Sequence, residues 1–119
     1  AGEVRIRHTA IGVNFLDVYF RTGLYPAPNG LPLTPGHEAA GVIEELGAGV
    51  DGLKLGDRVA YASAIGAYAT ERVMPAEKLV KIPDGVSDEE AAAMMLKGMT
   101  AEYLLRRTFP VKPGDTVLY

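Results

Sequence analysis

Most of the side chains that could bind or orient a ligand lie in one short segment near the start of the chain. Between Asn14 and Tyr25 the sequence carries an amide, a carboxylate, a guanidinium and phenols. An amide and a phenol can direct hydrogen bonds into a cleft walled by an aromatic ring, so Asn14, Tyr19 and Tyr25 are candidates for holding a planar ligand. The residues alone favour a structural alternative, in which Asn14 caps a short helix and Tyr19 belongs to the core. Asp17 and Arg21, four residues apart, would then form an exposed helical ion pair.

A second group of candidate residues lies on a predicted helix near the end of the chain. Lys97, Thr100 and Tyr103 follow one another at intervals of three residues, which places them on neighbouring positions of one helical face. A threonine hydroxyl near a helix terminus can hold a carboxamide, and a lysine can meet a phosphate or a carboxylate. The alternative, favoured for each residue singly, is a surface lysine, a threonine bonded to the carbonyl four residues earlier, and a core tyrosine.

The Gly36-His37-Glu38 stretch offers a possible metal ligand followed by a carboxylate. Zinc catalysis needs about three nitrogen, sulfur or oxygen ligands from the protein. His8 and His37 are the only histidines and the chain has no cysteine, so we predict no metal site. We expect His37 to be a loop histidine and Glu38 to be a buried carboxylate paired with an arginine such as Arg58.

Composition excludes several classes of function. The absence of cysteine rules out disulfides, thiolate metal sites and cysteine nucleophiles, and it fits a cytoplasmic protein. A net charge of -3 with scattered basic residues gives no surface for nucleic acid. The sequence contains no apolar run long enough to span a bilayer and no signal peptide, so we expect no membrane partner. With 119 residues, of which 48% are hydrophobic, we expect one domain or a piece of one.

Alternating and apolar runs predict a mainly β structure over the first two thirds of the chain. The predicted strands cover residues 3–13, 38–46, 59–62, 66–74 and 79–82. A short helix is predicted over residues 14–21, and the proline-rich segment 25–35 is predicted to be a loop. Five short strands at this spacing indicate a barrel or a sandwich.

The last third of the chain changes to an α/β pattern. Ser87 and Glu90 have the spacing of a capping box, which predicts a helix that begins there. Gly98 is unfavourable inside a helix, so we expect a break near it, with Thr100 in the first turn of a second helical segment. Residues 116–119 read as the start of a buried parallel strand, and the first residues read as a strand already under way. We therefore expect the chain to be a fragment.

Four stretches of the sequence together resemble a known family. They are Ala-Ile-Gly-Val-Asn-Phe-Leu-Asp-Val-Tyr-Phe-Arg-Thr-Gly-Leu-Tyr, Pro-Gly-His-Glu-Ala-Ala-Gly-Val-Ile, Leu-Gly-Asp-Arg-Val-Ala-Tyr and Leu-Lys-Gly-Met-Thr-Ala-Glu-Tyr-Leu-Leu. In this order they resemble the zeta-crystallin-like quinone oxidoreductase branch of the medium-chain dehydrogenase/reductases. The resemblance implies a GroES-like, partly open β-barrel over residues 1–86, with its first strands missing. It further implies that residues 87–119 are a linking helix and the first strand of a truncated Rossmann domain that binds NADPH.

The resemblance also implies roles for individual residues. Asn14 and Tyr19 match family positions near the nicotinamide and the substrate, and we predict them as the catalytic residues. Tyr25 matches a position at the cleft, so Tyr19 and Tyr25 are the predicted substrate-binding residues. Asp17 matches the same motif without an assigned role, as does Arg21. The predicted cofactor-binding residues are Asn14, Tyr19, Lys97, Thr100 and Tyr103.

The implied reaction is a zinc-independent hydride transfer from NADPH to a quinone or an α,β-unsaturated carbonyl. Zinc-dependent alcohol dehydrogenase relatives place a cysteine ligand near the position of Asn14, whereas this chain keeps only the histidine, His37. The implied partners are a small-molecule substrate and, for the complete protein, a second copy in a homodimer. We expect the isolated chain to be catalytically silent. Two alternatives stay open, a zinc-dependent alcohol dehydrogenase-like enzyme and a non-enzymatic co-chaperonin-like ring subunit.

Overall fold

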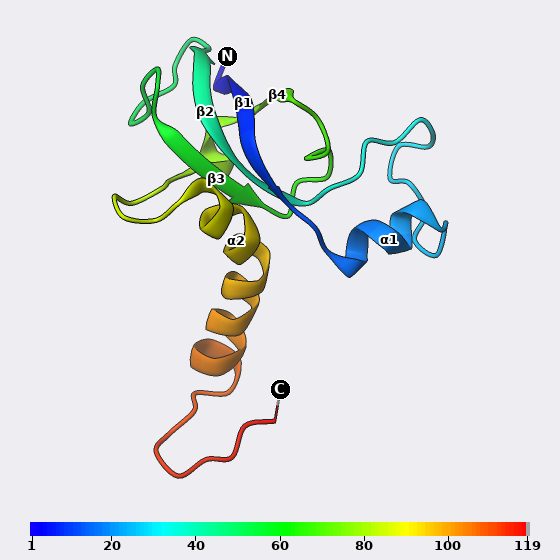
Figure 1. Cartoon of the computed structure of the whole chain (residues 1–119), viewed down its shortest axis with the longest axis vertical. Helices are drawn as coiled ribbons and strands as arrows, with labels where there is room; N and C mark the ends of the chain where they lie inside the picture. The colour runs from blue at the N-terminus through cyan, green and yellow to red at the C-terminus, as the bar shows by residue number, and fades with distance from the viewer. Residues whose placement is uncertain (119) are drawn as a thin grey trace.

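The computed structural model describes residues 1–118 and shows a curved β-sheet with helices beside and below it (Figure 1). The elements, in chain order, are β1 (Glu3–Gly12), α1 (Phe15–Arg21), β2 (Glu38–Leu46), β3 (Arg58–Ala62), β4 (Glu71–Pro75), η1 (Ala76–Lys78), β5 (Val80–Lys81), α2 (Asp88–Glu102) and η2 (Tyr103–Thr108). The short α1 lies to one side of the sheet, while α2 packs under it and runs away from it. The mainly β prediction is confirmed.

The five strands form one antiparallel sheet in the order β4-β1-β2-β3-β5. The alternation of polar and apolar residues that predicted β1 matches its burial in the structure, since Val4 and Ile6 are buried and their neighbours are not. β2 has the predicted bounds and is the central strand, buried along most of its length. β4 and β5 are the edges of the sheet, which agrees with a GroES-like barrel that is partly open.

Two clusters of buried side chains hold the sheet in place. The larger cluster contains Val4, Ile6, Ala39, Ile43, Val59, Tyr61, Ala67, Met74 and Leu79. The smaller cluster lies between the sheet and α2. Its buried residues are Ala40, Ala60, Ala91 and Ala92, and Ala10, Ile82, Val86 and Met95 pack around them. Because alanine is short, the helix backbone approaches the sheet closely along this second cluster.

The predicted capping box begins α2 as expected. The Glu90 N–H donates to the Ser87 hydroxyl over 3.1 Å, and the Ser87 N–H donates to the Glu90 carboxylate over 2.8 Å. Arg58 on β3 holds the same end of the helix, because its guanidinium donates to Asp88 and to the Val86 carbonyl over 2.8 and 2.7 Å. The start of α2 is therefore tied to the first residue of β3.

The predicted break at Gly98 is wrong, because α2 runs without interruption from Asp88 to Glu102. Thr100 accordingly lies in the last turn of α2 and not in the first turn of a second helix. The cost of one glycine, about 1 kcal/mol, is too small to break a helix that is capped at its start and packed on the sheet. The helical chain continues as the π-helical turn η2.

Two strand predictions also differ from the structure. Residues 66–70 are not strand, because Gly66 has φ of +112° and Tyr68 donates its N–H to the Pro35 carbonyl over 2.9 Å. The segment 116–118 is not a strand, and Tyr119 lies outside the described residues. A strand forms only when a neighbour accepts and donates its ladder hydrogen bonds, and none of the strand pairings of residues 1–118 includes this segment.

Two glycine substitutions should have opposite effects on stability. Gly98→Ala should raise the free energy of unfolding by up to about 1 kcal/mol, because alanine favours the helix. The new Cβ would lie 3.1 Å from Cγ of Met94, a side chain that is 56% exposed and can move. Gly12→Ala should lower the free energy of unfolding by about 1–3 kcal/mol, since the new Cβ would collide with the Ala92 carbonyl and with Glu38.

Urea unfolding followed by circular dichroism measures both changes. A destabilised Gly98→Ala would mean that the helix near Met94 cannot adjust. A neutral Gly12→Ala would contradict the close approach of α2 to β1.

Candidate functional site

A buried carboxylate lies where β2, α2 and the start of α1 meet. Glu38, the first residue of β2, has no exposed surface. Its Oε1 accepts a hydrogen bond from the Asn14 side-chain amide over 2.8 Å and one from the Lys97 ammonium over 2.6 Å. Its Oε2 accepts from the backbone N–H of Leu96 over 2.6 Å. We call Asn14, Glu38, Lys97 and this backbone N–H the Glu38 cluster.

The third side of this cluster joins the lysine to the asparagine. The Lys97 ammonium donates to Oδ1 of Asn14 over 2.8 Å, so the carboxylate, the amide and the ammonium form a closed triangle. Lys97 keeps 57% of its side chain exposed, while the carboxylate that it neutralises has none. The cluster thus presents a positive charge and an amide toward solvent and hides the negative charge.

A second buried carboxylate lies on α1. Oδ1 of Asp17 is 2.6 Å from Nδ1 of His37, and its Oδ2 accepts from the backbone N–H of Asn14 over 2.9 Å and from the Tyr68 hydroxyl over 3.0 Å. The His37 ring stacks on Phe20 with 5.3 Å between ring centroids. This Asp17 cluster, made of Asp17, His37 and Tyr68, fixes α1 to the loop before β2.

The hydrogen bonds of the Asp17 cluster decide its ionisation. Burial alone would raise the pKa of Asp17, but the bonds from His37, the Asn14 N–H and Tyr68 outweigh it and hold this pKa below its ordinary value. Burial, together with the bond to Asp17, raises the pKa of the Tyr68 phenol. At neutral pH the cluster therefore holds an ionised carboxylate and a protonated phenol.

The aromatic residues of the first candidate segment contact one another. The rings of Tyr19 and Tyr25 meet edge to face with 5.5 Å between centroids, and Phe20 meets Tyr25 in the same way at 5.8 Å. Tyr19 is 37% exposed and Tyr25 is 45% exposed, so both rings present a face outside the core. They supply an aromatic wall with phenol hydroxyls at its border.

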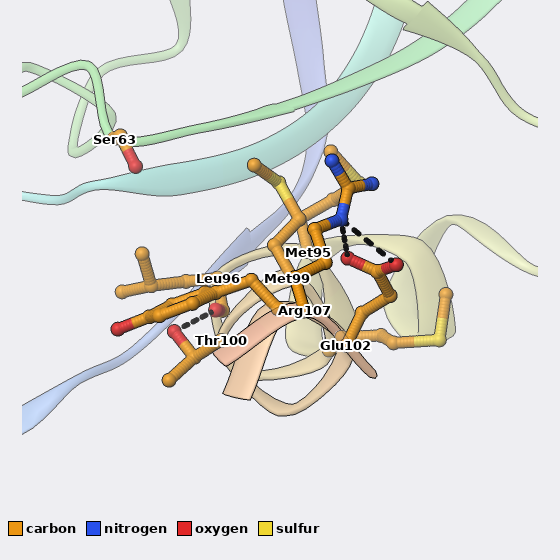
Figure 2. Close-up of a pocket in the computed structure, with 10 residues that line it drawn as sticks. Ser63, Met95, Leu96, Met99, Thr100, Glu102 and Arg107 are labelled. Carbon is orange, nitrogen blue, oxygen red and sulfur yellow. Dashed lines mark hydrogen bonds and ion pairs between the residues drawn. The ribbon is translucent and has the colours of Figure 1, made fainter. Parts of the chain in front are cut away.

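A pocket of about 810 Å³ lies along the second half of α2 (Figure 2). It is lined by Ser63, Met94, Met95, Leu96, Gly98, Met99, Thr100, Glu102, Tyr103 and Arg107. Figure 2 shows the Thr100 hydroxyl donating to the Leu96 carbonyl, over 2.8 Å, and Arg107 paired with Glu102. Ser63 lies across from them on another segment and has φ of +66°, which is uncommon for a residue with a side chain.

The predicted site residues fall into three groups in the structure. Asn14 and Lys97 are joined directly in the Glu38 cluster. Tyr19 and Tyr25 form the aromatic wall, and Thr100 and Tyr103 line the pocket on α2. Among residues 1–118, no hydrogen bond or ring contact joins the aromatic wall to the pocket. The catalytic, substrate-binding and cofactor-binding roles of these residues stay predictions.

Two pairings expected from the sequence are wrong. Glu38 does not pair with Arg58, which instead holds Asp88, because the start of β2 faces the middle of α2 and Lys97 reaches it there. Asp17 does not pair with Arg21, because its side chain points inward to His37. The expected bond from Thr100 to the carbonyl four residues earlier is present.

Sequence reasoning assigned no functional part to Asp17, Glu38 or Tyr68, which hold the candidate residues in place. A signal was present in the sequence, since Glu38 and Asp17 are acids beside apolar neighbours, and a buried acid requires partners. Tyr68 gave no such signal, because its bond to Asp17 crosses 51 positions of the sequence.

The described residues bear on metals and membranes as well. Within residues 1–118, no three His, Cys, Asp or Glu side chains lie close enough together to hold a metal ion. None of the helices in this part of the chain has both the length and the apolar character that crossing a bilayer requires.

Comparison with known proteins identifies the fold family. A profile of the alcohol dehydrogenase GroES-like domain matches residues 1–84. The chain belongs to the alcohol dehydrogenase GroES-like domain family. Its relatives include a quinone oxidoreductase of Pseudomonas aeruginosa, which is 54% identical over 98% of this chain and 36% of the relative. A 2-haloacrylate reductase of a Burkholderia species is 52% identical over 98% of this chain and 37% of the relative.

Solved structures agree with this assignment. The Escherichia coli quinone oxidoreductase complexed with NADPH superimposes on this GroES-like domain with a TM-score of 0.91 and 47% identity, covering 96% of this chain and 35% of that one. A Pseudomonas syringae quinone oxidoreductase superimposes with a TM-score of 0.89 and 54% identity, covering 96% of this chain and 35% of that one. The chain thus spans about a third of the length of the relatives that it matches.

The lowered pKa of Asp17 should make part of the stability of the GroES-like domain depend on pH. The folded-state pKa lies below the unfolded value of about 3.9. The carboxylate therefore stabilises the fold above that value, and its contribution is lost as the pH falls through the folded-state pKa. Asp17→Asn should be less stable than wild type at neutral pH and should lose less stability between about pH 5 and pH 2.

Urea unfolding at a series of pH values tests this expectation. Asp51→Asn, which changes an exposed loop carboxylate, is the matched control and should follow wild type. An acid dependence of Asp17→Asn as steep as that of wild type would show that the Asp17 cluster does not carry the effect.

Proposed function

We propose that this GroES-like domain forms the nicotinamide and substrate side of a zinc-independent reductase that transfers a hydride from NADPH to a quinone or an α,β-unsaturated carbonyl. The observation that carries the proposal is the similarity, over nearly the whole chain, to quinone oxidoreductases, one of them solved with NADPH. The activity would belong to the full-length gene product, in which the segment from Ser87 onward would lead into a Rossmann nucleotide-binding domain.

The residues of the α2 pocket fit a nicotinamide. An aromatic ring needs apolar walls and a few polar groups that fix its orientation, and Met94, Met95, Leu96 and Met99 give this pocket apolar walls. The Thr100 hydroxyl uses its proton on the Leu96 carbonyl, so its lone pairs remain to accept from a carboxamide N–H. We assign the nicotinamide end of NADPH to Thr100 and Tyr103, with Asn14 and Lys97 beside them. When bound, NADPH supplies the hydride.

The aromatic wall fits the electron acceptor. A quinone is planar and apolar with a carbonyl at each end, so Tyr19 and Tyr25 would contact its ring. A hydride added to a quinone leaves a negative charge on an oxygen, which takes up a proton to give the hydroquinone. The Tyr19 phenol would donate a hydrogen bond to that oxygen, and the Lys97 ammonium would favour the charge electrostatically.

One relative indicates a second class of acceptor. The similarity to a 2-haloacrylate reductase makes a conjugated carbonyl compound a candidate substrate beside quinones. Both acceptors are electron-poor double-bond systems conjugated to an oxygen, and both place the developing charge on that oxygen. The same donors would therefore serve either one.

NADPH oxidation by the full-length gene product tests the proposal, with 1,4-benzoquinone and 2-chloroacrylate as acceptors and with a metal chelator present. We expect activity that resists the chelator with at least one acceptor. Tyr19→Phe and Asn14→Ala should each lower kcat/KM by about 10- to 100-fold, because each removes a group that orients a reactant or stabilises charge.

Asn29→Ala is the matched control, since Asn29 is an exposed asparagine on the proline-rich loop. Its kcat/KM should equal that of wild type. Activity that the chelator abolishes would favour the zinc-dependent alcohol dehydrogenase alternative. An absence of activity with both acceptors would favour a non-enzymatic domain.

A further inference from the structure

The Asn14 side chain is held at both ends by groups of opposite charge. Its Nδ2 donates to the Glu38 carboxylate over 2.8 Å, and its Oδ1 accepts from the Lys97 ammonium over 2.8 Å. If the amide turned over, its carbonyl would face the carboxylate and its N–H₂ group would face the ammonium. Both contacts would be repulsive, so the surrounding charges select one orientation of the amide.

We propose that Glu38 and Lys97 act together as positioning residues that hold the Asn14 amide in this one orientation toward the ligand. In the contacts made by residues 1–118, each end of the amide is used once, which leaves one N–H and one carbonyl lone pair. A neighbouring donor and acceptor are complementary to a carboxamide, such as that of a nicotinamide. This inference rests on the proposed function and adds Glu38 to the residues on which that function depends.

The burial of Glu38 explains why the arrangement is rigid. A buried carboxylate is tolerated only when its charge is paired and its oxygens are hydrogen-bonded. Glu38 meets this condition through the amide, the ammonium and the Leu96 N–H. Loss of the ammonium would leave the buried charge unpaired, and loss of either neutral donor would leave a carboxylate oxygen with one hydrogen bond fewer.

The same contacts fix the position of α2 relative to Asn14. Leu96 and Lys97 lie about one turn before Thr100 and about two turns before Tyr103, and both of these residues line the α2 pocket. Glu38 therefore sets the distance between the amide and the pocket as well as the orientation of the amide. The positioning is a property of the cluster and needs no metal ligand.

The sequence allows a direct observation of the Asn14 amide. Asn14 and Asn29 are the only asparagines of the chain, so a sample labelled with ¹⁵N in asparagine side chains gives two NH₂ signals in an NMR spectrum. Asn29, on an exposed loop, serves as the internal reference. We expect one Asn14 proton to lie downfield of the Asn29 protons, because it donates to a carboxylate.

Two variants and one control test the positioning in this spectrum. Glu38→Gln keeps the shape of the side chain but removes its charge, and Lys97→Met removes the ammonium from the exposed side of the cluster. Glu38→Gln should remove the downfield proton, because the carboxylate acceptor is gone. Lys97→Met should shift the Asn14 signals, because the amide oxygen loses its donor, and the Asn29 signals should stay in place in both variants. Lys81→Met is the control: it breaks a comparable ammonium-carboxylate pair, between Lys81 and Asp57 at 2.8 Å, and should shift neither the Asn14 nor the Asn29 signals. Unchanged Asn14 signals in both variants would overturn the proposal.

A double-mutant cycle in the full-length gene product separates positioning from a general structural effect. Glu38→Gln should lower kcat/KM with 1,4-benzoquinone by up to about 100-fold, because a small displacement of an orienting group is costly. In an Asn14→Ala background the same change should cost little, since no amide remains to be positioned. If Glu38→Gln lowers kcat/KM by the same factor in both backgrounds, the two residues act independently and the proposal is overturned. A wild-type protein without NADPH oxidation would refute the proposed function, whereas the NMR spectra would still decide the positioning.

Discussion

The complete burial of one carboxylate constrains the rest of this structure. Glu38 starts the central strand of the sheet and can remain there only with partners for its charge. Those partners come from two other parts of the chain, Asn14 between β1 and α1, and Leu96 and Lys97 on α2. Neither the first candidate segment nor the last helix can move independently of the sheet without exposing an unpaired charge. One residue thus links the two groups of candidate site residues that lie farthest apart in the sequence.

Close packing makes these hydrogen bonds possible. A hydrogen bond to the backbone of α2 requires the helix to approach the sheet within the reach of one glutamate side chain. The alanines between the sheet and α2, together with Gly12, provide the room for this approach. The apolar contact and the polar cluster therefore depend on each other, because larger residues at the contact would pull the Leu96 N–H away from the carboxylate.

Local features were predictable from the sequence, whereas pairings between distant segments were not. The cap at Ser87 and the bounds of β2 follow from residues a few positions apart, and both are confirmed. Glu38 was expected to be buried and paired, and it is, but its partner is Lys97 and not Arg58. The type of partner follows from the chemistry of a buried acid, while its identity depends on how α2 crosses the sheet. The prediction of a helix break at Gly98 was wrong for the opposite reason. Glycine does disfavour the helix locally, but the packing of α2 on the sheet outweighs that cost.

The neighbours His37 and Glu38 each attach a different helix to the start of β2. Successive residues of an extended chain point to opposite sides, and here His37 reaches Asp17 on α1 while Glu38 reaches Lys97 on α2. Gly36, with φ of +92°, turns the chain just before them and packs against Tyr68. The ring nitrogen Nδ1 of His37 is engaged by the Asp17 carboxylate over 2.6 Å. Two adjacent side chains therefore attach one helix each. Asn14 contacts both attachments, because its backbone N–H donates to Asp17 and its side-chain amide donates to Glu38. The candidate site lies at this meeting point.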